Sequence, residues 1–418
     1  MSELSSMSSM SSMSSMSSMS SMSNLGGRPG VAGIAALSGL LGEPLLTDGL
    51  LNAQGEQSIS PGAAAVQRYG DFQPGQLPAL RNQRRLGWWQ PEVRAHICSQ
   101  ELQCGLQLIA EMKPDRPVAQ LLHVDRQAAG KYVERPLISI GRPTRDVFDA
   151  QLSKVQAHTR TDLRRKRAPE ILTQTVPQVP YWSTVVPLSP WRTPWTWELV
   201  GTSLHFGMQV VHRFKHAFAV PRPHELSPRI QPILLVPGWA AFPSGHATEA
   251  FMFARLMKSL LSLQDGDDMS QALQQQALRI AENRVFAGLH YPVDGIAGRL
   301  LGVTLAEYVA ARCTGTMWQS RQFDASDSQA LMNADLDLKD LVGKAIPSPL
   351  AFNPTLAELW ARAANELEEL GYRPLRHGKT KAAGPALTHS QKRKRRASAP
   401  RVNAAKEAGG TPHVQANP

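Results

Sequence analysis

Cysteine is scarce in this chain of 418 residues: only Cys98, Cys104 and Cys313 are present. Their number is odd and their spacing matches no metal-binding pattern, so a disulfide framework is not expected. Long apolar runs are lacking too. No stretch of roughly 18 apolar residues occurs, and the sequence therefore argues against a transmembrane helix.

A good secretory signal is also missing near the N-terminus. Residues 31–42 are apolar, but this run is short, rich in Gly and Ala, and lacks a basic start. We therefore predict a soluble protein that is located in the cytoplasm.

Acidic residues are few at the C-terminal end, where the positive charge of the chain is concentrated. The formal net charge is +11, and residues 373–418 contribute +10 of it through eleven Lys and Arg against one Glu. The remaining chain is close to neutral, so its charge does not indicate a nucleic-acid-binding body. We predict that residues 373–418 form a basic disordered tail; contact of this tail with an anionic surface or nucleic acid is the alternative.

Sequence complexity is low at the other end of the chain. Residues 5–22 repeat Ser-Ser-Met, and a Gly-rich stretch follows to about residue 61. Such a segment cannot bury enough apolar surface to offset the entropy of ordering it. We predict a low-complexity, disordered N-terminus over residues 1–61.

Helical spacing of apolar residues begins after the N-terminal segment. From Val93 to Ile109 apolar residues recur at near-helical intervals, and residues 146–167 indicate one charged helix. Residues 176–197 contain five prolines and four tryptophans, which predicts an irregular loop packed on the domain. We assign residues 83–345 to a helical domain, which also contains the candidate catalytic residues described below.

Four longer helices follow, and no long strand is evident in this part of the sequence. A last helix, residues 353–371, begins at Asn353 as its cap, has Pro354 at the first helical position and ends at Gly371. The pattern predicts an all-α fold, a helical bundle with irregular connections. The four longer helices are expected at residues 197–220, 246–263, 270–287 and 292–312.

Three short clusters carry the candidate chemistry, and the middle one is Pro243-Ser244-Gly245-His246. Ser244 is a good helix cap, and Gly245 lets a ligand approach the backbone. The helix that follows points free N–H groups at the same place. Because helix N-termini carry partial positive charge and bind anions, His246 in the first turn can face a bound anion.

The last cluster is Arg284-x5-His290-x3-Asp294. Tyr291 precedes Pro292 and is pushed out of helical geometry, so we expect His290 in a tight turn between two helices. Asp294 can then hold one ring nitrogen of His290 and leave the other aimed at the site. This is the base-and-orienter arrangement of catalytic triads, here with a histidine nucleophile. The alternative is a histidine that caps a turn.

The first cluster, Lys215-x6-Arg222-Pro223, supplies positive charge. Proline on both sides of Arg222 breaks the helix that carries Lys215 and holds Arg222 in a rigid turn. Arg contacts two oxyanion oxygens at once and Lys adds a compact charge, while Arg284 adds a second guanidinium. We predict that the three clusters converge on one tetrahedral oxyanion, with phosphate first among the candidates.

The combined pattern resembles that of the type-2 phosphatidic acid phosphatase and vanadium haloperoxidase superfamily. The family pattern is Lys-x6-Arg-Pro, Pro-Ser-Gly-His and Ser-Arg-x5-His-x3-Asp, and this chain has KHAFAVPRP, FPSGHATEA and NRVFAGLHYPVDG. Asn283 stands where many members have Ser, and it can still donate and accept hydrogen bonds. The resemblance covers residues 197–312, the motif core of the helical domain.

The resemblance implies a helical bundle and, in the phosphatase members, a reaction on a small phosphate ester without a metal or other cofactor. His290 would attack phosphorus and form a phosphohistidine, and His246 would protonate the leaving alcohol and then activate water. Asp294 would orient His290. The phosphoryl oxygens would be held by Lys215, Arg222, Ser244, Gly245 and Arg284.

The haloperoxidase members are an alternative that the resemblance leaves open. In them vanadate replaces phosphate, the residue that matches His290 binds vanadium, and hydrogen peroxide oxidises a halide. Trp239, seven residues before His246, is a candidate for lining the substrate or halide site. We favour the phosphatase because the segment from His290 to Asp294 looks more like those members. A non-catalytic anion-binding protein is a third, more remote interpretation.

Overall fold

The computed structural model describes residues 48, 52, 86–87, 89–112, 117–126, 130–175, 178–325, 345–346 and 353–372. All of them belong to the first of two units of the chain, residues 1–375. The two segments predicted to be disordered, residues 1–61 and 373–418, lie outside the described residues except for positions 48 and 52. The predicted disorder of both segments stays a prediction.

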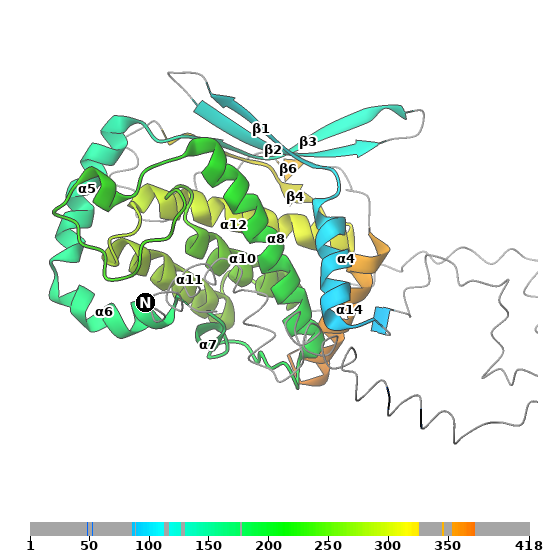
Figure 1. Cartoon of the computed structure of the whole chain (residues 1–418). Helices are drawn as coiled ribbons and strands as arrows, with labels where there is room; N and C mark the ends of the chain where they lie inside the picture. Colours follow the sequence, from blue (N-terminus) through cyan, green and yellow to red (C-terminus); the bar gives the residue numbers. More distant parts are fainter. Residues whose placement is uncertain are drawn as a thin grey trace, which may run out of the picture. The chain divides into compact units, whose positions relative to one another are not determined.

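Four long helices form the centre of the described structure (Figure 1). α8 covers Pro194–Phe218 and α10 covers Gly245–Leu260. α11 covers Asp268–Phe286 and α12 covers Pro292–Thr314. The sequence predicted all four of these helices. Nearly every residue of α12 is buried, because this helix packs against α10 and α14 as well as against the strands described below.

α10 and α12 approach each other closely because two glycines of α12 face α10. A Cβ atom on Gly298 would lie 2.6 Å from the backbone oxygen of Ser244, and one on Gly302 would lie 2.9 Å from the backbone nitrogen of Met252. Side chains at these positions would push the helices apart. The close packing brings both N-termini together, and the Ser244 N–H donates to the backbone oxygen of Asp294 over 2.9 Å.

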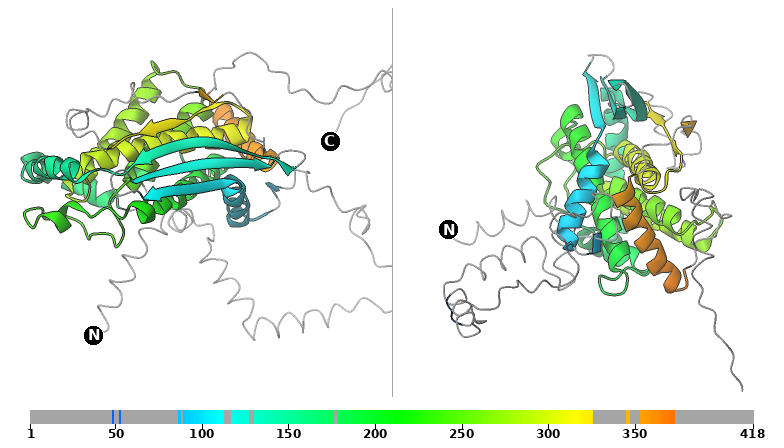
Figure 2. Two further views of the ribbon diagram at one scale, coloured as in Figure 1. Left: turned by 90° about the horizontal axis from the view of Figure 1, so that it is seen from above. Right: turned by 90° about the vertical axis from the view of Figure 1, so that its right-hand side faces the viewer.

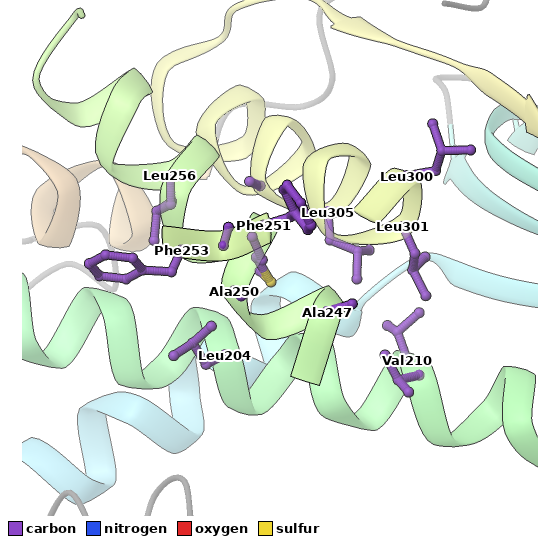
Figure 3. Close-up of a cluster of buried hydrophobic side chains, with 14 of the residues drawn as sticks. Leu204, Val210, Ala247, Ala250, Phe251, Phe253, Leu256, Leu300, Leu301 and Leu305 are labelled. Carbon is purple, nitrogen blue, oxygen red and sulfur yellow. The ribbon is translucent and has the colours of Figure 1, made fainter. Parts of the chain in front are cut away.

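Apolar side chains from these helices fill the space between them (Figure 3). Leu204 of α8, Phe253 of α10 and Leu305 of α12 are each no more than 3 % exposed. Burying one such side chain contributes roughly 1.5–3 kcal/mol to stability. This core therefore fixes the positions of the helix ends that carry the three sequence clusters.

Two helices from distant parts of the chain lie along α8 (Figure 1). α4 covers Pro91–Gln103 and α14 covers Pro354–Glu369. The Asn353 side chain accepts hydrogen bonds from the N–H groups of Thr355 and Leu356, each over 3.0 Å, so its predicted capping role is confirmed. Among the helices that the described residues form, none is both long and apolar enough to cross a membrane.

Two helices that precede α8 in the chain pack against α11. α5 covers Arg145–Thr159 and α6 covers Asp162–Thr173. The prediction of one helix over residues 146–167 was therefore wrong in this detail. The break comes at Thr161, whose hydroxyl accepts a hydrogen bond from the N–H of Arg164 and so caps α6.

The segment rich in Pro and Trp is less irregular than predicted. The single-turn helix α7, Val179–Trp182, lies inside this segment. The last residues of the segment, from Pro194 on, already belong to α8. Trp182 is 3 % exposed and stacks on Phe253 of α10, with ring centroids 4.2 Å apart. This contact holds the segment against α10, which is a packing role for the tryptophan. Another short helix, α9, covers Pro223–Leu226.

A mixed sheet packs against α12 and α8 (Figure 2). Its strand order is β1-β2-β3-β5; the first three strands are antiparallel, and the short β5 is parallel to β3. Two further short strands, β4 and β6, pair antiparallel. The strands are β1 Leu106–Met112, β2 Pro117–Arg126, β3 Tyr132–Gly141, β4 Trp318–Gln319, β5 Arg321–Phe323 and β6 Ala345–Ile346.

The prediction of an all-α fold was wrong in part, because this sheet accompanies the helices inside residues 83–345. Sequence analysis continued one helix from Val93 to Ile109, whereas α4 ends before Gly105. Gly105 has a φ of +86°, a left-handed conformation that stops a helix, and Leu106 then begins β1. In β3 exposed and half-buried residues alternate over the first half of the strand, the two-residue period of a strand.

Candidate active site

The three sequence clusters lie at helix ends that the bundle brings together. Lys215 is in the last turn of α8, Ser244 caps α10, and Arg284 is in the last turn of α11. His290 precedes α12, and Asp294 lies in its first turn. We call this group the anion site. Its members are Lys215, Arg222, Ser244, Gly245, His246, Arg284, His290 and Asp294.

His290 and Asp294 form a buried pair at the start of α12. The Nδ1 atom of His290 lies 2.8 Å from Oδ2 of Asp294, and the two side chains are 6 % and 0 % exposed. The backbone N–H of Tyr291 donates to the same carboxylate oxygen over 3.1 Å. When Asp294 is ionised its carboxylate only accepts hydrogen bonds, so that Nδ1 carries the ring proton and Nε2 carries the lone pair.

The turn that carries His290 has the geometry that the sequence predicted. Gly288 ends α11 with a φ of +79°, a conformation that favours glycine. Tyr291 is extended, with φ −82° and ψ 155°, and Pro292 is the first residue of α12. These local restraints place His290 within reach of Asp294 one turn along.

Lys215 and Arg222 are each 2 % exposed and are held by backbone oxygens. Nζ of Lys215 donates to the oxygens of residues 240–241, each over 2.8 Å. Arg222 donates through Nε to the oxygen of Trp239 over 3.1 Å and through Nη1 to that of Leu289 over 3.0 Å. Its buried Nη2 has no hydrogen-bond partner among the described residues, so this nitrogen is available to an anion.

The N-terminus of α10 adds its partial positive charge to these side chains. Ser244 is 1 % exposed and accepts a hydrogen bond from the N–H of Ala247 over 3.4 Å. Gly245 is the first helical residue, and the methyl group of Met208 on α8 would lie 3.4 Å from a Cβ atom there. Ser244 and Gly245 therefore lie at the start of the helix that carries His246.

Arg284 is 1 % exposed and is anchored by the end of α6. Its Nη2 donates to the backbone oxygen of Ile171 over 3.1 Å and to Oε1 of Gln174 over 2.8 Å. Nδ2 of Asn283 donates to the same Gln174 oxygen over 3.1 Å. Within the described part of the chain, the buried Nε and Nη1 of Arg284 have no partner, so both can donate to a ligand.

His246 contacts the same segment. Its Nε2 lies 3.1 Å from the backbone oxygen of Gln174. Since a carbonyl oxygen only accepts, Nε2 carries the ring proton and Nδ1 is the atom that can take up or release one. Sequence analysis missed Gln174 because no motif marks it, and its contact with Arg284 spans 110 residues of chain.

Burial dominates the electrostatics of the anion site. It lowers the pKa of Arg222 and of Arg284, each to about 10, and lowers the pKa of Lys215 well below its ordinary value. Burial also lowers the pKa of His290, and the surrounding positive charges lower it further, so the ring is neutral near pH 7. In Asp294 burial raises the pKa of the carboxyl. Positive groups so concentrated in a poorly solvated site favour an anionic ligand.

The neutral state of His246 predicts a pH dependence of stability. Burial, followed by the charge of Arg284, lowers the pKa of His246 to about 3. An unfolded histidine has a pKa of about 6.5, so the unfolded state binds more protons between these values and stability falls as the pH is lowered. Lowering the pH from 6.5 to 5 should raise the unfolding equilibrium constant of the wild type roughly tenfold more than that of His246→Gln.

Urea denaturation of both proteins at these two pH values measures this shift. The comparison with His246→Gln cancels the opposite contribution of Glu249, whose pKa burial raises to about 7. Parallel stability curves for the two proteins would show that His246 takes up its proton as easily in the folded state as in the unfolded one.

Trp239 borders the anion site through its backbone, which binds Arg222 as described above. Its ring packs edge-on against His212 of α8, with ring centroids 5.4 Å apart and an interplanar angle of 82°. The predicted lining residue is therefore adjacent to the site. Among the described residues, no group of three His, Cys, Asp or Glu side chains is arranged to hold a metal ion.

Comparison with known families agrees with the pattern of the three clusters. Residues 197–316 match the family model of the PAP2 superfamily. This segment belongs to the PAP2 superfamily. The PAP2 segment runs from the first turn of α8 to just beyond α12 and contains every residue of the anion site. No curated protein matches the chain.

The match of residues 197–316 to the PAP2 superfamily indicates an enzyme of the phosphatase and haloperoxidase type. The sheet strands β1 to β3, helices α4 to α7 and α14 lie outside the PAP2 segment. So does Gln174, although it contacts Arg284, Asn283 and His246 inside it. The anion site of this chain is therefore completed by a residue that the family segment does not contain.

Proposed function

We propose that this protein is a phosphatase that hydrolyses a small phosphate ester through a phosphohistidine at His290. The observation that supports this proposal most directly is the buried contact of 2.8 Å between His290 and Asp294. Positive groups surround that pair and lower the pKa of His290. A protein that only binds anions has no need of a histidine whose tautomer is fixed by a carboxylate. The PAP2 superfamily match supports phosphatase-type chemistry.

In the first step Nε2 of His290 attacks phosphorus with its lone pair. The bond between phosphorus and the ester oxygen breaks, and the leaving oxygen takes the electron pair of that bond. A protonated His246 gives this oxygen its Nδ1 proton, so that an alcohol leaves. The pKa of His246 is low in the ligand-free site, and the negative charge of a bound phosphate raises it, which allows the ring to carry this proton.

In the second step water attacks the phosphohistidine. His246, now neutral, takes a proton from the water through Nδ1, and the bond between phosphorus and Nε2 breaks to release phosphate. Asp294 keeps the Nδ1 proton of His290 in place through both steps and stabilises positive charge on the ring. The reaction requires no metal ion and no other cofactor.

Charge stabilisation is the main contribution of the other members of the anion site. The unpartnered Nη2 of Arg222 and the unpartnered Nε and Nη1 of Arg284 are donors that phosphoryl oxygens can accept. Lys215 and the N-terminus of α10 add charge nearby. Phosphoryl transfer depends mostly on positioning and on such preorganised charge, and the buried groups need little reorganisation during the reaction.

A vanadate-dependent haloperoxidase is the second candidate function. The position of Trp239 favours it: its backbone oxygen accepts from Arg222 and its ring packs against His212, and an aromatic side chain next to the anion site suits a weakly hydrated halide. The unpartnered guanidinium nitrogens would hold vanadate as well as phosphate, with His290 as its protein ligand. Bound vanadate would supply Lewis-acid activation of hydrogen peroxide.

Two parallel assays separate these functions. We expect the purified protein to release p-nitrophenol from p-nitrophenyl phosphate without added metal, and added vanadate to inhibit this release because it resembles the five-coordinate transition state. Bromination of a dye with hydrogen peroxide is measured on the same samples. Bromination that depends on vanadate, in a protein that releases no p-nitrophenol, would favour the haloperoxidase and contradict the phosphatase.

A further inference from the structure

Gln174 joins two functional groups of the anion site that come from different helices. It follows the last residue of α6 and is fully buried, with 0 % of its surface exposed. Its side-chain oxygen accepts hydrogen bonds from Arg284 and Asn283 of α11, and its backbone oxygen accepts one from His246 of α10. Neither step of the proposed reaction uses the side chain of Gln174.

The orientation of the Gln174 amide is fixed by charge. A guanidinium can only donate, so the end of the amide that faces Arg284 must be the oxygen. The other end, Nε2, donates to Oε1 of Glu170 over 3.2 Å. A cation at one end and a carboxylate at the other therefore define one amide rotamer, and the buried side chain cannot exchange these partners for water.

The contacts of Gln174 determine which donors of Arg284 a ligand can use. Gln174 and the backbone oxygen of Ile171 both accept from Nη2. Nε and Nη1 remain unpartnered among the residues that the structure describes, although both are buried. A guanidinium fixed at one nitrogen loses less entropy when its remaining donors bind an oxyanion than a freely rotating one.

The backbone contact has a second consequence. By accepting from Nε2 of His246, the Gln174 carbonyl fixes the tautomer in which Nδ1 exchanges protons. One residue outside the PAP2 segment thus links the group that binds the phosphoryl oxygens to the group that transfers the proton.

We propose that Gln174 is a positioning residue that orients Arg284 for a phosphoryl ligand and holds His246 in its reactive tautomer. The inference rests on the proposed function, because it takes the ligand to be a phosphoryl group. Gln174 itself does not touch the reacting atoms. Its loss should therefore weaken anion binding and turnover without removing any charged member of the anion site.

The test replaces Gln174 by Met, which has a similar volume and no amide acceptor. We expect the dissociation constant for inorganic phosphate, measured by calorimetry on the full chain, to rise roughly tenfold, because a guanidinium without this acceptor is less well oriented and loses more entropy when its donors bind the ligand. We expect KM for p-nitrophenyl phosphate to rise by a similar factor and kcat to fall less, because Arg284 loses its side-chain acceptor whereas the backbone oxygen that binds His246 remains.

Gln178→Met is the matched control. Gln178 is the same residue type, is 3 % exposed and lies on the same segment, but its side chain donates to Glu249 over 3.4 Å instead of contacting the anion site. We expect this variant to keep phosphate affinity and kinetics within twofold of the wild type. Wild-type phosphate affinity in Gln174→Met, or an equal loss in both variants, would overturn the proposal.

A second variant covers the case in which Gln174→Met does not fold. Gln174→Glu keeps an acceptor for Arg284, and its negative charge should weaken phosphate binding at least ~10-fold, since it competes with the ligand. Unchanged affinity in this variant also overturns the proposal. Phosphate binding and ester hydrolysis test different claims. A wild type that binds phosphate without hydrolysing the ester contradicts the proposed function. The phosphate affinities of the variants, compared with that of the wild type, still decide the role of Gln174.

Discussion

Replacement of His290 by Ala is expected to lower kcat by about 10⁴-fold or more, because removing a catalytic nucleophile has effects of this order. The variant should still fold, since Oδ2 of Asp294 loses the ring but keeps the hydrogen bond from the N–H of Tyr291. It should also still bind inorganic phosphate, because Lys215, Arg222 and Arg284 remain.

Trapping of the intermediate tests the role of His290 more directly than the rate alone. Rapid quenching with a substrate labelled at phosphorus should leave acid-labile label on the wild type and none on His290→Ala. His216→Ala is the control, because this histidine follows Lys215 on α8 but is exposed. Full activity in His290→Ala, or label that persists in that variant, would show that another residue attacks phosphorus.

Replacement of Gly302 by Ala is expected to lower the free energy of unfolding by ~2 kcal/mol or more, as overpacking of a close contact does. The new methyl group would overlap the backbone oxygen of Thr248 and lie 2.9 Å from the backbone nitrogen of Met252. Backbone atoms inside a helix cannot rotate away as a side chain can. α10 and α12 must therefore separate, which outweighs the gain in helix propensity of about 1 kcal/mol from Gly to Ala.

Gly295→Ala is a matched control on the same helix. A Cβ atom at Gly295 meets no atom within 4 Å among the described residues, so the substitution should be neutral or should stabilise the protein by about 0.5–1 kcal/mol. Chemical denaturation of the two variants and the wild type gives the comparison. Equal stability of Gly302→Ala and Gly295→Ala would show that the two helices adjust to the extra methyl group without strain.

The Gly302 variant also connects packing with the anion site. The contact between α10 and α12 includes the hydrogen bond from the Ser244 N–H to the backbone oxygen of Asp294. Separation of the helices would lengthen that bond and move His246 away from His290. We therefore expect a folded Gly302→Ala protein to lose activity as well, although residue 302 lies two turns away from the site.

The helices and their ends could be predicted from local signals. Asn353 with Pro354, Tyr291 with Pro292, and Gly288 each act within one or two residues, through capping or a restricted backbone conformation. The sheet could not be predicted in the same way. Residues 106–109 continue the apolar pattern of α4, and only the left-handed conformation of Gly105 separates helix from strand. Strand pairing depends on partners that are distant in sequence, which a local pattern does not contain.

By itself the sequence determined which groups are candidates for the chemistry, because Lys, Arg, His and Asp stand at fixed spacings around capped helix ends, and that local geometry is set by neighbouring residues. The tertiary structure alone decided how those groups are oriented and how burial shifts their pKa values. Gln174 is the clearest case: its role arises from contacts with His246 and Arg284, which are 72 and 110 residues away. Burial and hydrogen-bond direction are properties of packed neighbours, and the order of residues along the chain does not specify them.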